Sequence, residues 1–203
     1  MKEIVVAVPD GKRAEWVNGV LTLVDDVVGA TKDERPVMER IKTFEDACDE
    51  VGRLAERGNE GLATLLADYE SNADNIKTKG TLAYMKLCII AAALNEGWEP
   101  QFTTDEYRWY PWFTLWTKEE LADKTEEWKQ EHKLWIWGGY SNYGSMCGLA
   151  YAYSNDAWSV STSFISARLA VKSEELAEYF GKQFIEIWAD YVGPFNIKEE
   201  SDD

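Results

Sequence analysis

The side chains best suited to recognise another molecule lie in the middle of the chain, where seven of the ten tryptophans fall between residues 98 and 137. One stretch there, EYRWYPWFTLWTKEE at residues 106–120, holds three tryptophans, two tyrosines and a phenylalanine. Such rings bury a large area with few rotatable bonds and keep a polar tip, so they anchor interfaces and stack on sugars and bases. The chemistry that they predict is binding. The alternative is that most of these rings form the core of the domain.

A strand over residues 107–116 would point alternate rings to opposite faces of a sheet. Pro111 cannot donate a backbone hydrogen bond, which places this strand at an edge. One face can join the core under a helix predicted at 80–96, whereas the other is covered only by a polar helix predicted at 118–132. We therefore expect a groove or patch lined by at least two partly exposed rings out of four, with three charged residues at its rim. The four rings and the three rim residues are Trp98, Tyr110, Trp112, Trp116, Arg108, Asp105 and Glu106.

The sequence evidence for catalytic residues is weaker than the evidence for a binding surface. The only histidine, His132, could serve as the base for a Cys147 nucleophile. However, His132 lies among Glu126, Glu127 and Glu131, which favours a solvated surface position. One histidine and three widely spaced cysteines also lack the ligand spacing of a zinc site. We therefore predict no catalytic residue, no metal and no cofactor.

Two further segments could carry chemistry. The glycine-rich WGGYSNYGSMCGLAY at residues 137–151 could cradle a phosphate, but it lacks the Lys-Ser/Thr end of a P-loop and leads into a strand. We interpret it as a connection between two strands. The neighbouring carboxylates Asp105 and Glu106 could bind a cation or form the acid–base pair of a glycosidase across a ring-lined cleft. In a chain with 37 acidic residues, some acids lie near one another by chance.

The net charge and the hydropathy of the chain limit the classes of partner that it is expected to bind. The formal net charge is −16, so direct binding of DNA or RNA is not expected, because it depends on neutralising phosphates with Lys and Arg. A strong acidic excess suits basic partners, cations or mimicry of nucleic acid. The longest apolar run, Leu87–Leu94, is too short to span a bilayer, and the N-terminus makes a poor signal peptide. We expect no membrane partner and a cytoplasmic location, which the three cysteines also fit.

The helices and strands that must position these residues are predicted from the periodicity of apolar residues and from the residues that cap helices or form turns. Glu3–Pro9 has the β-branched composition of a strand, and Asn18-Gly19 between apolar runs predicts a hairpin that continues into a strand at Val20–Val27. Thr43 is a predicted helix cap, and Gly58 ends that helix. A second short helix is predicted from the spacing of its apolar residues, which are Leu62, Leu65, Leu66 and Tyr69.

The remaining elements complete an α+β fold. Leu82–Leu94 is apolar on nearly all sides and predicts a helix in the domain interior, with Gly97 as its stop. We expect an antiparallel sheet of C-terminal strands packed by a C-terminal helix at 174–192, with a helical middle segment and an N-terminal strand or hairpin. The predicted C-terminal strands are Leu134–Tyr140, Gly148–Ser154 and Ala167–Lys172.

The domain organisation follows from these elements. The 203 residues are predicted to form a single α+β domain. Its finer subdivision would be a strand and helical part at 1–97, an aromatic-rich sheet with its helix at 98–194, and an acidic tail at 195–203.

Three stretches together resemble a known group of sequences. They are EIVVAVPDGK, LAYMKLCIIAAALNEGWEPQFTTDEYRWYPWF and SARLAVKSEELAEYFGKQFIEIW. The pattern N-E-G-W-x-P ahead of Y-x-W-Y-P-W-F, with R-L-x-x-K-S-E-E-L-A downstream, resembles a family of proteins of tailed bacteriophages of gut bacteria and of related host loci. The resemblance implies a phage or mobile-element origin and a place in the host cytoplasm or the virion. It carries no active site that could be transferred to this chain.

These observations leave three hypotheses for function. The first is a non-enzymatic, phage- or mobile-element-encoded interaction protein that binds a host or virion protein through an aromatic-rich surface, seen as a flat exposed apolar patch. The second is a binder of a small ligand such as a nucleotide signal or a sugar, seen as a ring-lined pocket with a few convergent polar groups. The third is an acidic DNA mimic that inhibits a host protein, with carboxylates spaced along one elongated face.

Overall fold

The structure is a computed structural model that divides the chain into two compact units, Met1–Pro36 and Val37–Asp203. The residues that it describes are 12–17, 20–25, 33, 35–137, 140–141, 146–159, 167–193 and 197–198.

The first unit contains a hairpin. Strand β1 (Lys12–Val17) pairs antiparallel with β2 (Val20–Asp25), and Val17 stands opposite Val20. This pairing confirms the hairpin predicted around Asn18-Gly19, although β2 ends at Asp25 rather than Val27. The strand predicted over Glu3–Pro9 lies outside the described residues.

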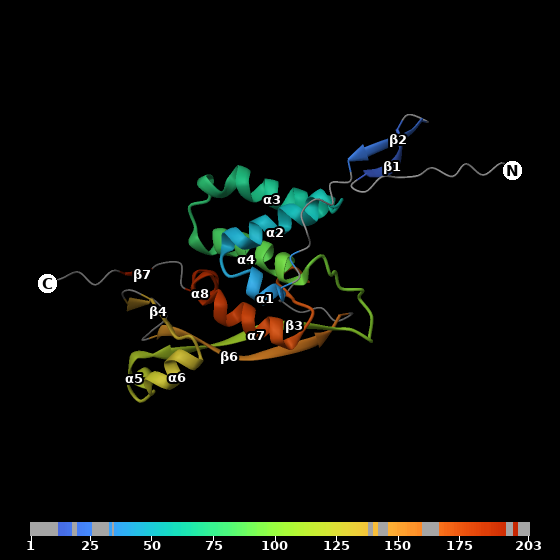
Figure 1. Ribbon diagram of the computed structural model, residues 1–203. Coiled ribbons are helices and arrows are strands. Elements are labelled where there is room, and N and C mark those ends of the chain that lie inside the picture. The colour runs from blue at the N-terminus through green and yellow to red at the C-terminus, as the bar shows by residue number, and fades with distance from the viewer. Residues whose placement is uncertain are drawn as a thin grey trace. The chain divides into compact units, whose positions relative to one another are not determined.

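The second unit is built around a three-stranded antiparallel sheet with helices on both faces (Figure 1). Its strand order is β3 (Tyr107–Thr117), β6 (Met146–Trp158) and β4 (Trp135–Ile136). Helices α7 (Glu174–Gln183) and α8 (Ile185–Val192) cross one face. The short helices α5 (Lys118–Ala122) and α6 (Glu126–Glu131) lie on the other. This arrangement is the predicted α+β fold, with a C-terminal helical segment packed on an antiparallel sheet.

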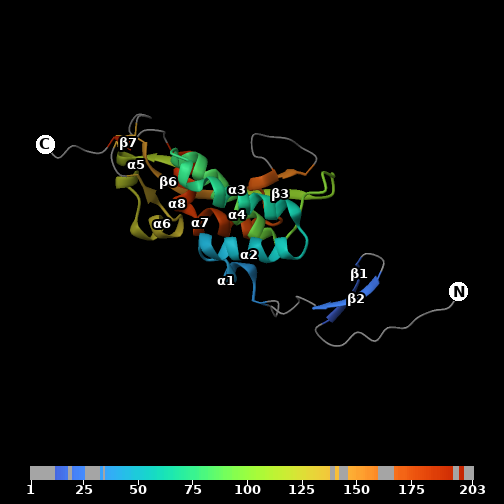
Figure 2. The same cartoon turned by 90° about the horizontal axis from the view of Figure 1, so that it is seen from above.

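A layer of helices covers α7 and α8 on the side away from the sheet. It contains α2 (Phe44–Glu56), α3 (Glu60–Asn72) and α4 (Lys79–Asn95), which pack against one another (Figure 2). Shorter elements connect and flank these layers. They are α1 (Val37–Arg40), the 3-10 turns η1 (Ala73–Asn75) and η2 (Ala167–Leu169), and the pair β5 (Tyr140–Ser141) and β7 (Ile197–Lys198).

The middle helices begin and end where the sequence predicts. Thr43 caps α2 by accepting a hydrogen bond from the Asp46 amide, and the Asp46 carboxylate accepts one from the Thr43 amide in return. Gly58 follows α2 with a φ of 100°, and Gly97 follows α4 with a φ of 85°. Both glycines have backbone angles in the left-handed region, which residues with a side chain rarely adopt, so each helix ends just before its glycine.

Helix α4 is the centre of the core, as its all-round apolar composition predicted. Leu87, Ile89, Ile90 and Leu94 are fully buried in one cluster with residues of α2, α7, α8 and β6. This core joins elements on both sides of residue 97. Of the helices formed by described residues, none has the length and apolar character needed to cross a membrane.

The strand predicted over Ala167–Lys172 is wrong. Ala167–Leu169 forms a 3-10 turn, and only Val171 makes a β-bridge, to Trp109 on the outer edge of β3. Its backbone amide and carbonyl exchange hydrogen bonds of 2.8 and 3.0 Å with Trp109. The long strand that pairs with β6 is instead the aromatic β3, and the third strand, β4, has only two residues. Alternation predicts strand character, but it does not predict which segments pair.

Two predicted helices are each divided. The segment predicted as helix 174–192 changes direction at Phe184, whose φ of −111° and ψ of 29° separate α7 from α8. The polar helix predicted at 118–132 is split into α5 and α6, because Thr125 forms a second N-cap by accepting a hydrogen bond from the Trp128 amide. A cap inside a polar segment ends one helix and starts another more easily than in a buried one.

Candidate functional site

The four rings of the predicted surface differ in their burial and in their described neighbours. Trp98, Trp112 and Trp116 are each partly exposed, which confirms the expectation for at least two of them. Tyr110 is buried, with 9% of its surface exposed. The described contacts of the three partly exposed rings differ from one ring to the next.

Trp112 lies in the middle of the sheet surface. It stacks on its cross-strand neighbour Tyr153, with ring centroids 6.0 Å apart. A second cross-strand pair, Tyr107 and Trp158, stacks at 4.0 Å near the end of the strands. Alternation places these two pairs on opposite faces of the sheet.

Trp116 is covered by the polar segment that follows it. The Trp128 ring of α6 meets it edge to face at 5.2 Å, and the Lys124 ammonium lies 4.3 Å from its centroid. This cation–π contact gives Trp116 a cover that the thin apolar side of the segment did not predict. The only histidine, His132, stacks on the other side of this cluster, with its ring 4.4 Å from Trp128. Its supposed nucleophile, the Cys147 side chain, lies outside the described residues.

The three rim residues also have different roles. Arg108 is buried, with 6% of its surface exposed, so it does not stand at a rim. Glu106 accepts hydrogen bonds from the Trp98 indole at 3.1 Å and the Gln101 amide at 2.8 Å, which ties down the segment after α4. Asp105 is exposed. The Glu106 carboxylate therefore has a structural role in this geometry.

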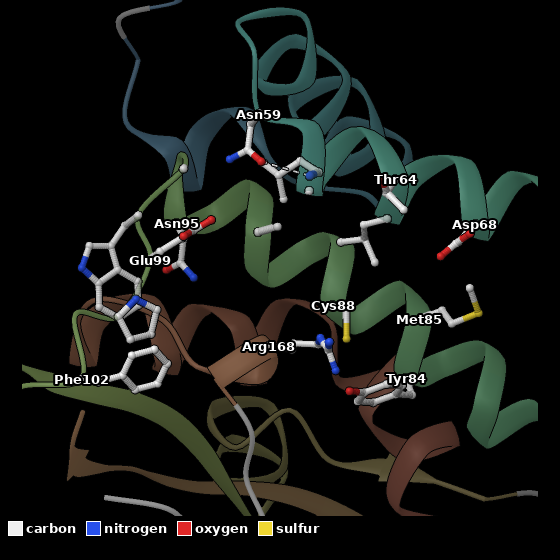
Figure 3. Close-up of a pocket in the computed structure, with 17 residues that line it drawn as sticks. Asn59, Thr64, Asp68, Tyr84, Met85, Cys88, Asn95, Glu99, Phe102 and Arg168 are labelled. Carbon is white, nitrogen blue, oxygen red and sulfur yellow. Dashed lines mark hydrogen bonds between the residues drawn. The ribbon is translucent and has the colours of Figure 1, made fainter. Parts of the chain in front are cut away.

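A cavity of about 610 Å³ lies between α3 and α4, and the segment after α4 forms part of its wall (Figure 3). Its wall is mainly apolar, and Trp98 is the one residue of the predicted surface that lines it. The other residues that line it are Asn59, Gly61, Leu62, Thr64, Leu65, Asp68, Tyr84, Met85, Cys88, Ala92, Asn95, Gly97, Glu99, Pro100, Phe102 and Arg168.

The walls of this pocket follow from local structure. Tyr84, Cys88, Ala92 and Asn95 are spaced by four, four and three residues, so they form one stripe along α4. Asn95 ends the stripe and is fixed there, because its amide donates to the Ala170 carbonyl at 2.9 Å and its oxygen accepts from the Lys172 amide at 3.1 Å.

The segment at 97–102 closes one end of the pocket. It begins at Gly97 and ends at Phe102, which has a positive φ of 55° and a side chain that is 63% exposed. A phenylalanine in the left-handed region is strained by roughly 1 kcal/mol or more. The hydrogen bonds that Glu106 accepts from Trp98 and Gln101 hold the segment in this shape.

Polar groups converge at the other end of the pocket. The Arg168 guanidinium points toward Tyr84 and Cys88 (Figure 3). Burial raises the pKa of the Cys88 thiol, although its hydrogen bond with Tyr84 and the nearby Arg168 charge act in the opposite direction. Cys88 is therefore a neutral thiol at physiological pH and not an activated nucleophile.

Arg168 is the most informative of these groups. It is exposed, and its guanidinium makes no hydrogen bond or ion pair with any residue that the structure describes. An arginine at the edge of an apolar cavity, with its charge uncompensated, offers a site for an anionic group. Within the described ranges, no group of His, Cys, Asp and Glu side chains is arranged to hold a metal ion.

The sequence did not predict the residues that line the pocket, for two reasons. The stripe on α4 belongs to a helix that is apolar on nearly all sides, so its pocket-lining residues resemble core. Arg168 reaches the pocket from a turn more than seventy residues later in the chain, and no local pattern indicates that approach.

The chain significantly matches no family model, no curated protein and no solved structure.

Proposed function

We propose that the protein binds a small amphipathic organic molecule in the pocket between α3 and α4, without transforming it chemically. The observation that carries this proposal is a cavity of about 610 Å³ whose wall is mainly apolar and whose edge holds the uncompensated Arg168. It corresponds to the second hypothesis drawn from the sequence, a ring-lined pocket with a few convergent polar groups.

The size and surface of the cavity support a ligand. Small-molecule sites typically occupy about 300–1,000 Å³ and combine apolar walls with few polar groups that set orientation. Leu62, Leu65, Met85 and Ala92 supply apolar wall that is only partly buried in the free protein. Removing this surface from water would contribute about 25 cal/mol for each Å² covered, so an apolar ligand body gains free energy on entry.

A fluorescent probe tests the proposal directly. We expect 8-anilinonaphthalene-1-sulfonate, an aromatic monoanion, to bind with increased fluorescence and with a stoichiometry near one. Thr64→Trp places a large ring at the pocket edge from the exposed face of α3 and should weaken probe binding by about tenfold or more.

The matched control is Ala63→Trp, which adds the same ring at the preceding, exposed position of α3 that does not line the pocket. It should leave probe affinity unchanged. Equal affinities for both variants and the parent protein would show that the probe binds elsewhere, and would contradict the proposed pocket.

A second candidate is the interaction protein of the first hypothesis. The observation in its favour is the pair Trp112 and Tyr153, which lies on the sheet with Tyr153 51% exposed. Stacked rings at a wet surface can anchor a protein partner. Trp112→Ala should then weaken capture of that partner by about 2 kcal/mol or more, with a smaller loss of stability. The phage origin and the DNA-mimic hypothesis stay predictions.

A further inference from the structure

We infer that the ligand of this pocket is a monocarboxylate with an elongated apolar or aromatic body, and not a nucleotide, a polyphosphate or a sugar. This inference rests on the proposed function, since it names the chemical class that the same pocket takes. Three features of the pocket carry it: the donors at one end, the charges around its edge and the distance to the rings at the other end.

The acid-binding end consists of Arg168 and Tyr84. The guanidinium of Arg168 can donate two parallel hydrogen bonds to one carboxylate, the geometry in which arginine binds such groups best. The Tyr84 hydroxyl lies beside it, next to Cys88 on the same face of α4 (Figure 3). The Tyr84 hydroxyl is hydrogen-bonded to the Cys88 thiol, and turning its proton from the sulfur to a carboxylate held by the guanidinium would give that carboxylate a third donor.

The charges around the pocket favour one negative charge and disfavour several. Arg168 is the only cation among the described residues that line the cavity, and the acids Asp68 and Glu99 also line it. Phosphate groups carry more charge than one arginine compensates, and both acids would repel the remainder. The net charge of −16 for the chain adds to this repulsion.

Three polar side chains of the wall already use their hydrogen-bonding groups, in whole or in part, within the protein. Asn59 accepts a hydrogen bond from the Leu62 amide as the cap of α3, and the Thr64 hydroxyl donates to the Glu60 carbonyl. Both functional groups of Asn95 are also used by the backbone at Ala170 and Lys172. The wall between the two ends therefore offers a ligand mostly apolar contact.

The two ends of the pocket set the length of the ligand. Tyr84 and Asn95 stand eleven residues apart on α4, which corresponds to about 16 Å along the helix. Beyond Asn95 the pocket ends at Trp98, Pro100 and Phe102. A carboxylate at Arg168 thus places an elongated body along the α3–α4 wall, with its far end against these rings, where an aromatic group can stack.

Two probes that differ only in the acid group test this class. We would titrate the protein with 1-pyrenebutyrate and with its uncharged analogue 1-pyrenebutanol and follow pyrene fluorescence. The butyrate should bind about tenfold or more tightly, because a hydrogen bond to a charged group contributes that much. ATP at millimolar concentration should not displace it.

Two variants assign the effect to the acid-binding end. Arg168→Gln should weaken pyrenebutyrate binding by about tenfold while leaving pyrenebutanol binding unchanged. Tyr84→Phe keeps the ring and removes the donor, so it should weaken only the butyrate, by a few-fold. Arg57→Gln, at an exposed arginine that does not line the pocket, is the matched control and should change neither affinity.

The outcomes separate this inference from the proposed function. Equal binding of both probes, both blocked by Thr64→Trp, would overturn the carboxylate assignment and keep the pocket as a ligand site. Displacement by micromolar ATP would overturn it in favour of a nucleotide. Failure of both pyrene probes and of the anilinonaphthalene probe to bind would contradict the proposed function itself.

Discussion

Gly181 of α7 lies so close to Pro111 of β3 that a β-carbon at residue 181 would stand 2.7 Å from the Cβ atom of Pro111. The same β-carbon would stand 2.8 Å from a ring carbon of Tyr151 on β6. The helix backbone therefore rests directly on the two long strands of the sheet, β3 and β6. Residues 111, 151 and 181 come from three elements and define the distance between the sheet and its helical layer.

Gly181→Ala should destabilise the protein by about 1–3 kcal/mol, because the added methyl forces the helix away from the sheet. The matched control is Gly52→Ala in α2, where the nearest atom would lie 3.9 Å away. That change should stabilise by about 0.5–1 kcal/mol, because alanine has the higher helix propensity. Chemical denaturation of both variants gives the comparison, and two shifts of the same sign would contradict the packing.

Phe184→Ala should cost about 3–5 kcal/mol of unfolding free energy. Phe184 is only 4% exposed at the point where α7 meets α8, and it packs against Phe180 and Tyr179. Phe102→Ala, at a ring that is 63% exposed, should cost far less. An unchanged denaturation midpoint for Phe184→Ala would show that this stripe of the helices faces water.

Arg40→Ala should destabilise strongly, by about 3–5 kcal/mol, because it leaves a buried carboxylate without its main partner. The guanidinium of Arg40 lies 2.7 Å from Glu50 and 2.7 Å from Glu96, and the side chains of Arg40 and Glu50 are 6% and 9% exposed. Arg53 also pairs with Glu50, but its side chain is 40% exposed. Arg53→Ala should therefore cost only about 1 kcal/mol or less, and equal losses in thermal denaturation would contradict this ranking.

The contribution of Tyr179 to the stability of the folded protein should be lost at alkaline pH. Burial, and then the charge of Asp46, raises the pKa of its hydroxyl from about 10 to about 12. This hydroxyl also donates a 2.7 Å hydrogen bond to the Ile41 carbonyl. Because the folded state holds the proton more tightly, the contribution is complete below pH 10 and declines as the pH rises to 12.

The variant Tyr179→Phe isolates this effect. At pH 8 it should be about 1 kcal/mol less stable than the parent protein, since it lacks the hydrogen bond. Between pH 10 and 12 the difference should shrink, because only the parent protein has the ionising group. Urea unfolding across this range measures it, and two parallel stability curves would show that Tyr179 does not titrate with a raised pKa.

Local chemistry explains which parts of the fold could be predicted. The cap at Thr43, the stops at Gly58 and Gly97, and the hairpin at Asn18-Gly19 each depend on residues within four positions along the chain. Helix and turn preferences of neighbouring residues therefore predict these caps, helix ends and turns without information on the tertiary structure. The partial exposure of at least two of the four rings was also predicted locally, from Pro111 and the period of two along the strand.

Contacts between distant segments explain what could not be predicted. Val171 bridges to Trp109 and replaces a predicted strand, and Arg168 reaches a pocket formed by α3 and α4. Both placements require chain segments about sixty or more residues apart to meet, and no sequence period encodes such a meeting.

The sequence by itself therefore determined the α+β class, the order of most helices and the buried position of α4, because each follows from the period and the end signals of one segment. The tertiary structure decided where the rings and charges meet. It gave Trp98, Trp112 and Trp116 different described contacts, although they lie within nineteen residues. It also brought Tyr84 and Arg168 to the same end of one cavity. The physical reason is that burial and pairing are properties of packed surfaces, which exist only after distant segments have come together.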